Sequence, residues 1–578
     1  KVAGAGTVQS NGNITGAVDF DADGTLRLAD TKDITGAIIT STADTGSFVL
    51  AGSGSIDAFG TDGTELKSFQ ILGSSSIVSA GGNFEAAKTT DIGSGTLNVG
   101  GTIDVDAGQT LMFDIKGATA AGQMTATGNA SVDATAILSI DVVTGDAIAN
   151  AQSFTLIDGA GGAGVADLTT TILDNSYLVS FAQDTTSDSD LVVVATIGSK
   201  AAAATNTNNN AVGTVLDAIG TSANTQIAQL QQNLNTATSQ QAVNDILESS
   251  IPTVDGGAVV SALSVTNQSL NVIGTRLAEV RNDKVGTGMY AGNGLYGTKV
   301  WGQAFGNTAT QDERENVAGY DSNSLGLAAG IDTADKLEGM TLGFAGSYAV
   351  TNVDSDNANK TETEISSWQV AAYANYDLAD TAFLDVMLGY VFNDVESKRH
   401  NVAGTSGLTA EGDTTGNQYV ARFELGNDYH LKAFNEVVLT PTAMINYIHV
   451  DQDAYTESGA GGANLDVDPG DLDVFELGVA LEATWMKELS NGGIFEPAVH
   501  VGYRNDVIGD KVSASSKFIG GGTTFRTEGS DPVNSTFNVG FGATVYNTNS
   551  WEFTGGYDFE YKSEYAAHSG VVKAAYKF

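Results

Sequence analysis

The chain of 578 residues contains no cysteine, only 5 prolines and no long run of apolar residues. Without cysteine there are no disulfide bonds and no thiolate metal sites, a composition compatible with export through an oxidising compartment. A transmembrane helix needs about 20 consecutive apolar residues, so a helical membrane span is excluded. The 70 glycines instead favour many short strands and turns.

Basic residues are also scarce, since 26 Lys and Arg stand against 69 Asp and Glu and the formal net charge is −43. Such a surface repels phosphate backbones, and we therefore predict no nucleic-acid partner.

Histidine is absent from residues 1–297, because all 5 histidines lie beyond residue 399. Together with the lack of cysteine, this excludes a Ser-His-Asp or Cys-His catalytic apparatus from that part, and no G-x-S-x-G motif occurs. We predict that the chain is not an enzyme and expect neither a cofactor nor a metal site. The sequence opens within a repeat pattern, so we also expect a further upstream part, where any exported enzyme would lie.

Residues 1 to about 195 repeat a glycine followed by β-branched or apolar residues, as at 24–26, 46–48 and 101–103. This pattern predicts the turns of a parallel β-helix. We divide it into a stem, 1–94, and a cap with longer and more apolar strands, 95–199. The Asp-rich loop at 21–24 lacks the remaining ligands of a calcium loop and is interpreted as a plain turn.

Residues 200–297 predict a helical linker. The Asn-rich tract 206–210 is interpreted as flexible, and apolar residues recur at helical spacing between 215 and 247. A second helix is predicted over 258–281. About 24 residues make a helix roughly 36 Å long, enough to thread a bilayer-deep pore. Its many Ser, Thr, Asn and Gln residues suit a barrel lumen, although an ordinary connecting helix would also explain them.

Residues 298–578 contain about twelve strand-like runs of about ten residues in which one face is apolar and the other polar. Such runs are long enough to cross a bilayer as tilted strands of a closed barrel. The aromatic side chains that we predict to face lipid are Trp485, Trp551, Phe553, Tyr557, Phe559 and Tyr561. The carboxylates that we predict to face the lumen are Asp385, Glu424, Glu476, Glu482 and Glu496. The last strand carries Val572, Ala574, Tyr576 and the terminal Phe578 on one face.

The stretch TKVWGQAFG at 298–306, followed by LGLAAGID at 325–332, resembles the translocator domain of the monomeric type Va autotransporters. The acidic-aromatic strand 551–561 and the terminal Phe578 match the same family. The resemblance extends over essentially the whole chain, and it includes Gly/Thr/Asn-rich rickettsial surface antigens.

The resemblance implies an all-β protein with a helical linker: a right-handed parallel β-helix, followed by a 12-stranded transmembrane antiparallel barrel that holds the linker helix. It implies a passenger stem (1–94), an autochaperone-like cap (95–199), a linker (200–297) and a translocator (298–578). The barrel would lie in the Gram-negative outer membrane and export the passenger to the cell surface as an adhesin or surface-layer protein. Implied partners are outer-membrane lipid and lipopolysaccharide, periplasmic chaperones, the host-cell surface, and the barrel-assembly machinery, which would read the terminal strand.

Some members of this family cleave their own linker by cyclisation of an asparagine side chain, assisted by lumenal carboxylates. The resemblance puts Asn271 at the reactive position and Val272 where those members have a second asparagine. A linker that stays intact, or that another protease cuts, remains the alternative. For the whole chain, the alternatives are a channel or porin-like barrel, a carrier of an upstream enzyme, and a soluble β-helical adhesin that ends in a sandwich.

Overall fold

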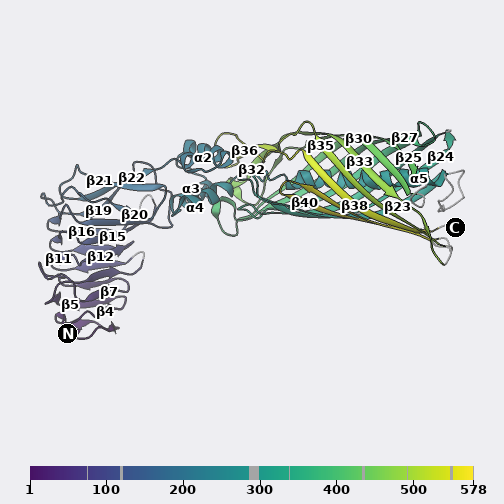
Figure 1. Cartoon of the computed structure of the whole chain (residues 1–578). Coiled ribbons are helices and arrows are strands. Elements are labelled where there is room, and N and C mark those ends of the chain that lie inside the picture. Colours follow the sequence, from purple (N-terminus) through teal and green to yellow (C-terminus); the bar gives the residue numbers. More distant parts are fainter. Residues whose placement is uncertain are drawn as a thin grey trace. The chain divides into compact units, whose positions relative to one another are not determined.

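The computed structural model describes residues 1–73, 76–117, 121–284, 298–337, 339–431, 437–490, 493–546 and 551–576. They form two compact units (Figure 1). The first unit comprises Lys1–Thr205, Val212–Leu247 and Ala403–Thr405. The second comprises Asn206–Ala211, Glu248–Val402 and Ser406–Phe578.

The second unit is a closed barrel of 12 antiparallel strands, as the sequence predicted. Its strands, in the order in which they follow around the barrel, are β23 (Thr298–Gln311), β24 (Tyr320–Leu337), β25 (Met340–Ser355), β26 (Glu362–Asp377), β27 (Ala382–Arg399), β28 (Ala410–Asn427), β30 (Val437–Gln452), β33 (Leu472–Thr484), β35 (Ile494–Asp506), β38 (Ser535–Tyr546), β39 (Trp551–Lys562) and β40 (Tyr565–Tyr576).

The barrel closes where the first strand pairs with the last. β23 and β40 are antiparallel from Ala304 opposite Val572 to Gln311 opposite Tyr565. Each of the 12 strands therefore has a neighbour on both sides, and the barrel has no open edge. Its strands are 12 to 18 residues long, longer than the alternating runs in the sequence. Because a tilted strand needs only about 9–11 residues to cross the hydrocarbon core, their ends extend beyond the bilayer.

The two faces of the barrel differ sharply in polarity. Large apolar side chains stand exposed on its outside, among them Leu325, Phe344, Val370, Phe541 and Val572. The residues that alternate with them face the lumen and are polar, as with the buried Gln369, Asn375, Gln418 and Asn446. An apolar outer band around a polar interior is the arrangement that lipid requires of a spanning barrel.

The two ends of the barrel also differ. At one end, long connections such as 400–409, 453–471 and 507–534 join the strands. Two of them contribute a four-stranded sheet of β31 (Tyr455–Thr456), β32 (Leu465–Pro469), β36 (Ser513–Phe518) and β37 (Phe525–Glu528). This end also carries η1 (Val402–Gly404) and η3 (Gly461–Ala463). The opposite end has shorter connections, with the short strands β29 (Tyr429–Leu431) and β34 (Lys487–Glu488).

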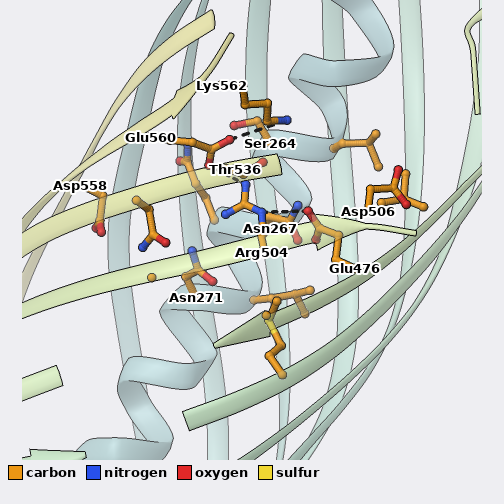
Figure 2. Close-up of a pocket in the computed structure, with 18 of the residues that line it drawn as sticks. Ser264, Asn267, Asn271, Glu476, Arg504, Asp506, Thr536, Asp558, Glu560 and Lys562 are labelled. Carbon is orange, nitrogen blue, oxygen red and sulfur yellow. Dashed lines mark hydrogen bonds and ion pairs between the residues drawn. The ribbon is translucent and has the colours of Figure 1, made fainter. Parts of the chain in front are cut away.

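The helices are α1 (Lys200–Ala203), α2 (Thr207–Ile219), α3 (Thr225–Asn235), α4 (Gln240–Glu248) and α5 (Gly257–Lys284). None of those in the described part of the chain combines the length and apolar composition of a membrane-spanning helix. α5 runs inside the barrel (Figure 2). The interpretation of 206–210 as a flexible linker is wrong, because α2 begins at Thr207. The Asn206 side chain accepts a hydrogen bond from the Asn209 backbone N–H at 2.7 Å and so starts this helix.

The first unit contains a parallel β-helix. An eight-stranded sheet consists of β1 (Thr7–Ser10), β4 (Thr25–Leu28), β7 (Ser47–Leu50), β9 (Ser68–Ile71), β12 (Thr89–Gly93), β15 (Thr110–Ile115), β18 (Ile137–Val142) and β20 (Leu173–Asp174). A nine-stranded sheet consists of β2 (Ile14–Thr15), β5 (Lys32–Thr35), β8 (Gly54–Ile56), β10 (Ile77–Ala80), β13 (Thr96–Val99), β16 (Gln123–Ala126), β19 (Ser153–Asp158), β22 (Leu191–Ile197) and β21 (Val179–Asp184). Shorter strands make a third side: β3 (Val18–Phe20) with β6 (Ile38–Thr40), and β11 (Phe84–Glu85), β14 (Ile103–Val105) and β17 (Ala130–Val132).

Parallel pairing ends where β19 pairs with β22 antiparallel, followed by β22 with β21. This antiparallel ending contacts the helices of the same unit. The Ser176 hydroxyl donates to the Asn235 carbonyl at 2.6 Å, and the Tyr177 N–H donates to the Ala237 carbonyl at 2.8 Å. The segment just before β21 is therefore hydrogen-bonded to the end of α3 and the residues after it.

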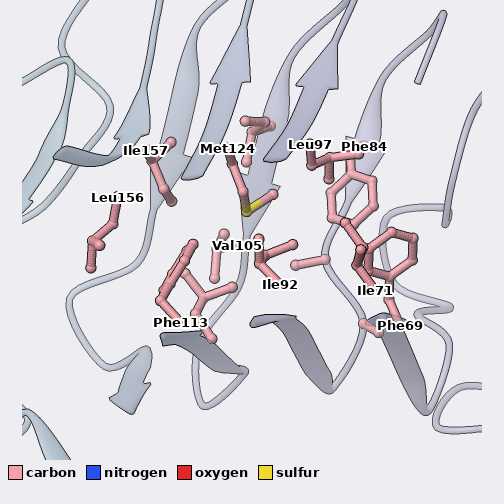
Figure 3. Close-up of a cluster of buried hydrophobic side chains, with 14 of the residues drawn as sticks. Phe69, Ile71, Phe84, Ile92, Leu97, Val105, Phe113, Met124, Leu156 and Ile157 are labelled. Carbon is pink, nitrogen blue, oxygen red and sulfur yellow. The ribbon is translucent and has the colours of Figure 1, made fainter. Parts of the chain in front are cut away.

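Apolar side chains stacked from turn to turn fill the interior of the β-helix (Figure 3). Four phenylalanines form a continuous cluster near the middle of the stem. The ring centroids of Phe69 lie 5.0 Å from Phe84, 4.9 Å from Phe59 and 6.2 Å from Phe48, and all four side chains are fully buried. Each phenylalanine thus packs against residues of neighbouring turns and joins them into one core.

We predict that Phe69→Ala lowers the free energy of unfolding of the β-helix by about 3–5 kcal/mol, because the cavity opens between two turns that the Phe69 ring joins. Pulse proteolysis of the detergent-solubilised chain in increasing urea measures the change. The matched control is Ile77→Ala on β10, whose side chain is 57% exposed, and we expect it to shift stability by less than about 0.5 kcal/mol. Equal midpoints for the two variants would contradict the prediction.

Candidate functional site

The candidate site is the barrel lumen with α5 inside it. The amino-terminal turns of this helix pack against the end of the barrel that carries the long connections. Ala262 lies in one buried cluster with Tyr320, Val353 and Ile365, which stand where β24 and β26 begin and β25 ends. The chain therefore enters the lumen from that end, and the carboxy-terminal turns of α5 lie nearer the end with short connections.

The carboxy-terminal turns of α5 are held by ion pairs to the barrel wall. Arg276 binds Asp332 of β24 through two hydrogen bonds, of 2.8 and 3.1 Å. The same carboxylate accepts the Tyr373 hydroxyl at 3.1 Å, and Trp301 donates to that hydroxyl at 2.7 Å. Asp332 is 1% exposed, so this pairing occurs away from solvent and is stronger than a surface salt bridge.

A second ion pair lies one and a half turns further along the helix. The Arg281 guanidinium donates to Asp385 of β27 at 2.7 Å and lies 3.5 Å from the centroid of the Phe383 ring. Asn375 donates to the other oxygen of the same carboxylate at 2.8 Å. Glu279, between the two arginines, accepts a 2.6 Å hydrogen bond from Lys573 of β40. Three charged side chains of α5 are thus bound to three different strands.

The middle of the helix is held by polar hydrogen bonds. Arg422 of β28 donates to the side-chain oxygens of Asn267 at 2.6 Å and Asn271 at 2.7 Å. Thr266 donates to Gln418 at 2.8 Å, and Ser269 donates to Ser347 at 2.9 Å. These contacts fix the rotation of α5 about its own axis, since Thr266, Asn267 and Asn271 face β28 whereas Ser269 faces β25.

On the side of the lumen away from β23–β27, a cavity of about 470 Å³ remains beside the helix. Arg504 crosses it and binds Glu476 at 2.8 Å and Glu560 at 2.6 Å (Figure 2). His500 is paired with Asp558 at 2.5 Å on the same side. The cavity is therefore lined by charged groups of both signs, a setting suited to water.

The segment just before α5 is bound at the long-connection end. Arg399 donates to the carbonyl oxygens of Ser249 at 3.2 Å and Ile251 at 2.9 Å, and Glu457 binds the same guanidinium through two hydrogen bonds of 2.7 Å. Asn359 also donates to the Ser249 carbonyl, at 3.0 Å. Both side chains of the Arg399–Glu457 pair are almost fully buried, so losing either partner would leave an uncompensated buried charge.

The acidic residues predicted to face the lumen lie on its wall but form no single group. Glu424, Glu476 and Glu482 line the cavity, whereas Asp385 is bound by Arg281 and Asn375. Glu496 lies on the same face of β35 as His500. Asn271 also lines the cavity, with its side-chain oxygen bound by Arg422 and its backbone carbonyl accepting the Thr275 hydroxyl at 3.0 Å.

Among the aromatic residues predicted to face lipid, Trp485, Phe553 and Tyr561 are exposed. Tyr557 donates or accepts a 2.6 Å hydrogen bond with His568 on the adjacent strand, and the Phe559 ring centroid lies 5.2 Å from the same imidazole.

The terminal strand reaches Tyr576 in the described structure, where it pairs with Trp551. Val572 is 68% exposed on the outer face. The side chains of Trp551, Ala574 and Tyr576, and the whole of Phe578, lie outside the described residues. The assignment of this strand as an assembly signal therefore stays a prediction.

The arginines that hold the helix and cross the cavity were not predicted from the sequence. Arg276, Arg281, Arg422 and Arg504 all bind acceptors in the lumen. The sequence did contain a signal for them. Arg422 and Arg504 stand on the polar faces of strands whose side chains alternate in polarity, and Arg276 and Arg281 lie on the same helix. Their partners depend on the register of the barrel and could not be read from sequence spacing.

The barrel part of the chain matches a known protein family. Residues 300–558 match the sequence profile of the family described as Autotransporter beta-domain. Outer membrane protein B of Rickettsia typhi is 24% identical over 64% of this chain and 24% of its own length, and that of Rickettsia rickettsii is 24% identical over 99% of this chain and 38% of its own length. The chain thus spans well under half of these relatives.

Two further similarities are to an esterase and to a solved translocator domain. Esterase EstA of Pseudomonas aeruginosa is 25% identical over 43% of this chain and 38% of its own length. The solved translocator domain of autotransporter NalP from Neisseria meningitidis is 16% identical with a TM-score of 0.40, covering 54% of this chain and 98% of that domain.

We predict that neutralising both wall carboxylates, with Asp332→Asn and Asp385→Asn, loosens α5 in the lumen. Each substitution replaces a charge-assisted hydrogen bond, worth about 1.5–3 kcal/mol, by a neutral one. Single-channel recordings in planar bilayers should show longer and more frequent openings than the parent chain.

The control for this pair is Glu362→Gln with Glu411→Gln, which removes the same charge from exposed residues at the long-connection end. We expect its recordings to match the parent. If the helix-facing pair also matched the parent, the ion pairs would not be what holds α5 in place.

Proposed function

We propose that the chain is a type Va autotransporter whose barrel lies in the Gram-negative outer membrane, and that it exports the β-helix of its first 200 residues and displays it at the cell surface. The direction of α5 is the observation that carries the proposal. Its amino terminus and the segment before it lie at the barrel end with long connections. In outer-membrane barrels the long loops face the exterior and the short turns face the periplasm.

A chain that runs from the β-helix through residues 249–256 into the lumen therefore leaves the barrel on the outside. The buried contacts of Arg399 and Asn359 hold this exit in place after transport. Export needs no ATP at this stage. A β-helix that has folded turn by turn outside the cell cannot pass back through the barrel as an unfolded chain.

The displayed part acts by contact, as an adhesin or a surface-layer segment. It has no histidine or cysteine before residue 298, and its exposed surface is acidic and repetitive. Lipid and lipopolysaccharide contact the barrel exterior, and periplasmic chaperones and the barrel-assembly machinery deliver it. The strand that ends at Phe578 is the segment the machinery recognises.

A channel is the function that this geometry favours least. α5 fills the lumen on the side of β23–β27, and Arg504 with its two carboxylates crosses the remaining cavity. A channel would also leave the β-helix without a role. Carriage of an enzyme is compatible with the barrel, and an enzyme would have to precede Lys1 in a longer chain.

Labelling of introduced cysteines tests the direction of export, since the parent chain has none. We predict that Ser131→Cys, on the exposed face of β17, reacts with a membrane-impermeant maleimide in intact cells. Asp380→Cys, in the short connection between β26 and β27, should react only after the outer membrane is permeabilised. The reverse pattern, or labelling of both in intact cells, would overturn the proposed orientation.

We propose that the linker is not cut at Asn271 by the chain itself. Cyclisation requires the Asn271 side-chain nitrogen to reach its own carbonyl carbon, whereas here Arg422 holds the side-chain oxygen against β28 and the carbonyl is bound within α5. Intact-mass measurement of the barrel purified without added protease should show no species that begins at Val272. If such a species appears and Asn271→Ala abolishes it, self-cleavage occurs.

A further inference from the structure

The β-helix holds successive turns together with acid–lysine pairs, and this series of pairs stops part of the way along. Lys67, just before β9, binds Asp23 at 2.6 Å, and Lys88, just before β12, binds Asp44 at 2.7 Å. Each pair is 44 residues apart and bridges two turns. The Asp21–Asp23 loop therefore uses lysines as its cations, with Lys1 on Asp21, in agreement with its interpretation as a plain turn.

At the next position of the series the lysine is missing. Gln109 stands just before β15, where Lys67 and Lys88 stand before their strands, and it is buried with its amide bound to the Ala86 carbonyl. The acid that continues the series of Asp23 and Asp44 is Glu65, whose backbone carbonyl accepts the Asp44 N–H. Glu65 consequently has no lysine two turns further along, where Asp23 and Asp44 each have one.

Other acids gather at this point. The carboxylate oxygens of Asp62, Glu65 and Asp106 lie within 4.8 Å of one another. They come from two turns, since Asp62 and Glu65 precede β9 and Asp106 follows β14. Among the residues that the structure describes, none of the three forms a salt bridge, in contrast to Asp23 and Asp44.

A fourth carboxylate lies on the turn between these two. Glu85 of β11 pairs in register with Asp104, and a side chain added at Gly60 would collide with its Cβ and carbonyl oxygen. Glu85 is only 8% exposed, and its Oε1 is buried with no hydrogen-bond partner in the described part of the chain. Burial, followed by the charges of Asp104, Asp106, Asp62 and Glu65, raises the pKa of Glu85 to about 8.

A buried carboxylate oxygen without a partner is costly, and like charges on stacked turns repel. The arrangement is stable when a cation takes the place that lysine occupies on the preceding turns. We propose that Asp62, Glu65 and Asp106 bind a divalent cation of the calcium type, which joins successive turns of the β-helix.

The ligand chemistry favours calcium over magnesium. Magnesium requires near-ideal octahedral geometry and keeps several of its water ligands. Only carboxylates form the site, and calcium accepts such irregular oxygen ligands. One carboxylate is exposed and two are half-buried, so we expect a dissociation constant in the range of about 10⁻⁴–10⁻³ M that is common for extracellular modules.

The test measures ⁴⁵Ca²⁺ binding to the full chain in detergent by equilibrium dialysis at 0.1–5 mM, the range being set by the affinity expected for such sites. The site variant carries Asp62→Asn, Glu65→Gln and Asp106→Asn. The matched control carries Asp146→Asn, Asp167→Asn and Asp188→Asn, which removes the same charge from the same β-helix. We expect the site variant to lose one saturable Ca²⁺ and the control to keep it. Equal binding by the two variants, or no saturable binding by the parent, would overturn the proposal.

A second variant distinguishes lost binding from lost folding. Glu85→Gln keeps the shape of the side chain and removes a carboxyl group that a bound cation would ionise. We expect it to fold without calcium, as judged by circular dichroism and protease resistance, and to bind Ca²⁺ about tenfold more weakly, because affinity follows the charge of the site. Unchanged affinity in folded Glu85→Gln would show that the ion, if bound, does not lie at this cluster.

Discussion

The pairing of β23 with β40 is the contact on which the rest of the second unit depends. In lipid each unpaired backbone N–H or C=O group costs several kcal/mol, so an open edge would not be tolerated. Closure of the 12 strands removes the open edge. It also encloses the inner faces of the strands as a polar lumen. The buried amides and charges of that lumen need partners, and α5 with its hydrogen-bonding side chains supplies many of them.

The polarity of the helix follows from where those partners stand. Arg276 and Arg281 meet Asp332 and Asp385 near the end with short connections, so the amino terminus of α5 points to the opposite end. Cations near the carboxy terminus of a helix also interact favourably with its dipole. The same contacts therefore hold the helix and fix its direction in the lumen.

Much of this fold could be predicted from sequence because period-two alternation determines both the strand and the face that each side chain occupies. The alternation around Phe553 and Glu560 placed one residue outside and the other in the lumen, as observed. The pairing of Arg504 with Glu476 and Glu560 could not be predicted, since it depends on the stagger of three strands. The tract at 206–210 was misread because its composition is that of a linker, whereas Asn206 caps a helix.

The β-helix carries a large excess of acidic side chains, and this composition bears on how its turns stack. With 23 acidic and only 6 basic side chains in residues 1–199, lysine cannot bridge every pair of turns. The three carboxylates at Asp62, Glu65 and Asp106 come together only when the turns before and after Glu85 have stacked. A cation there would bind the folded β-helix and not the unfolded chain, adding about 1.4 kcal/mol when its concentration is tenfold above its dissociation constant. The acidic side chains that keep the unfolded chain from associating would then also stabilise the stacked turns, because they bind the cation.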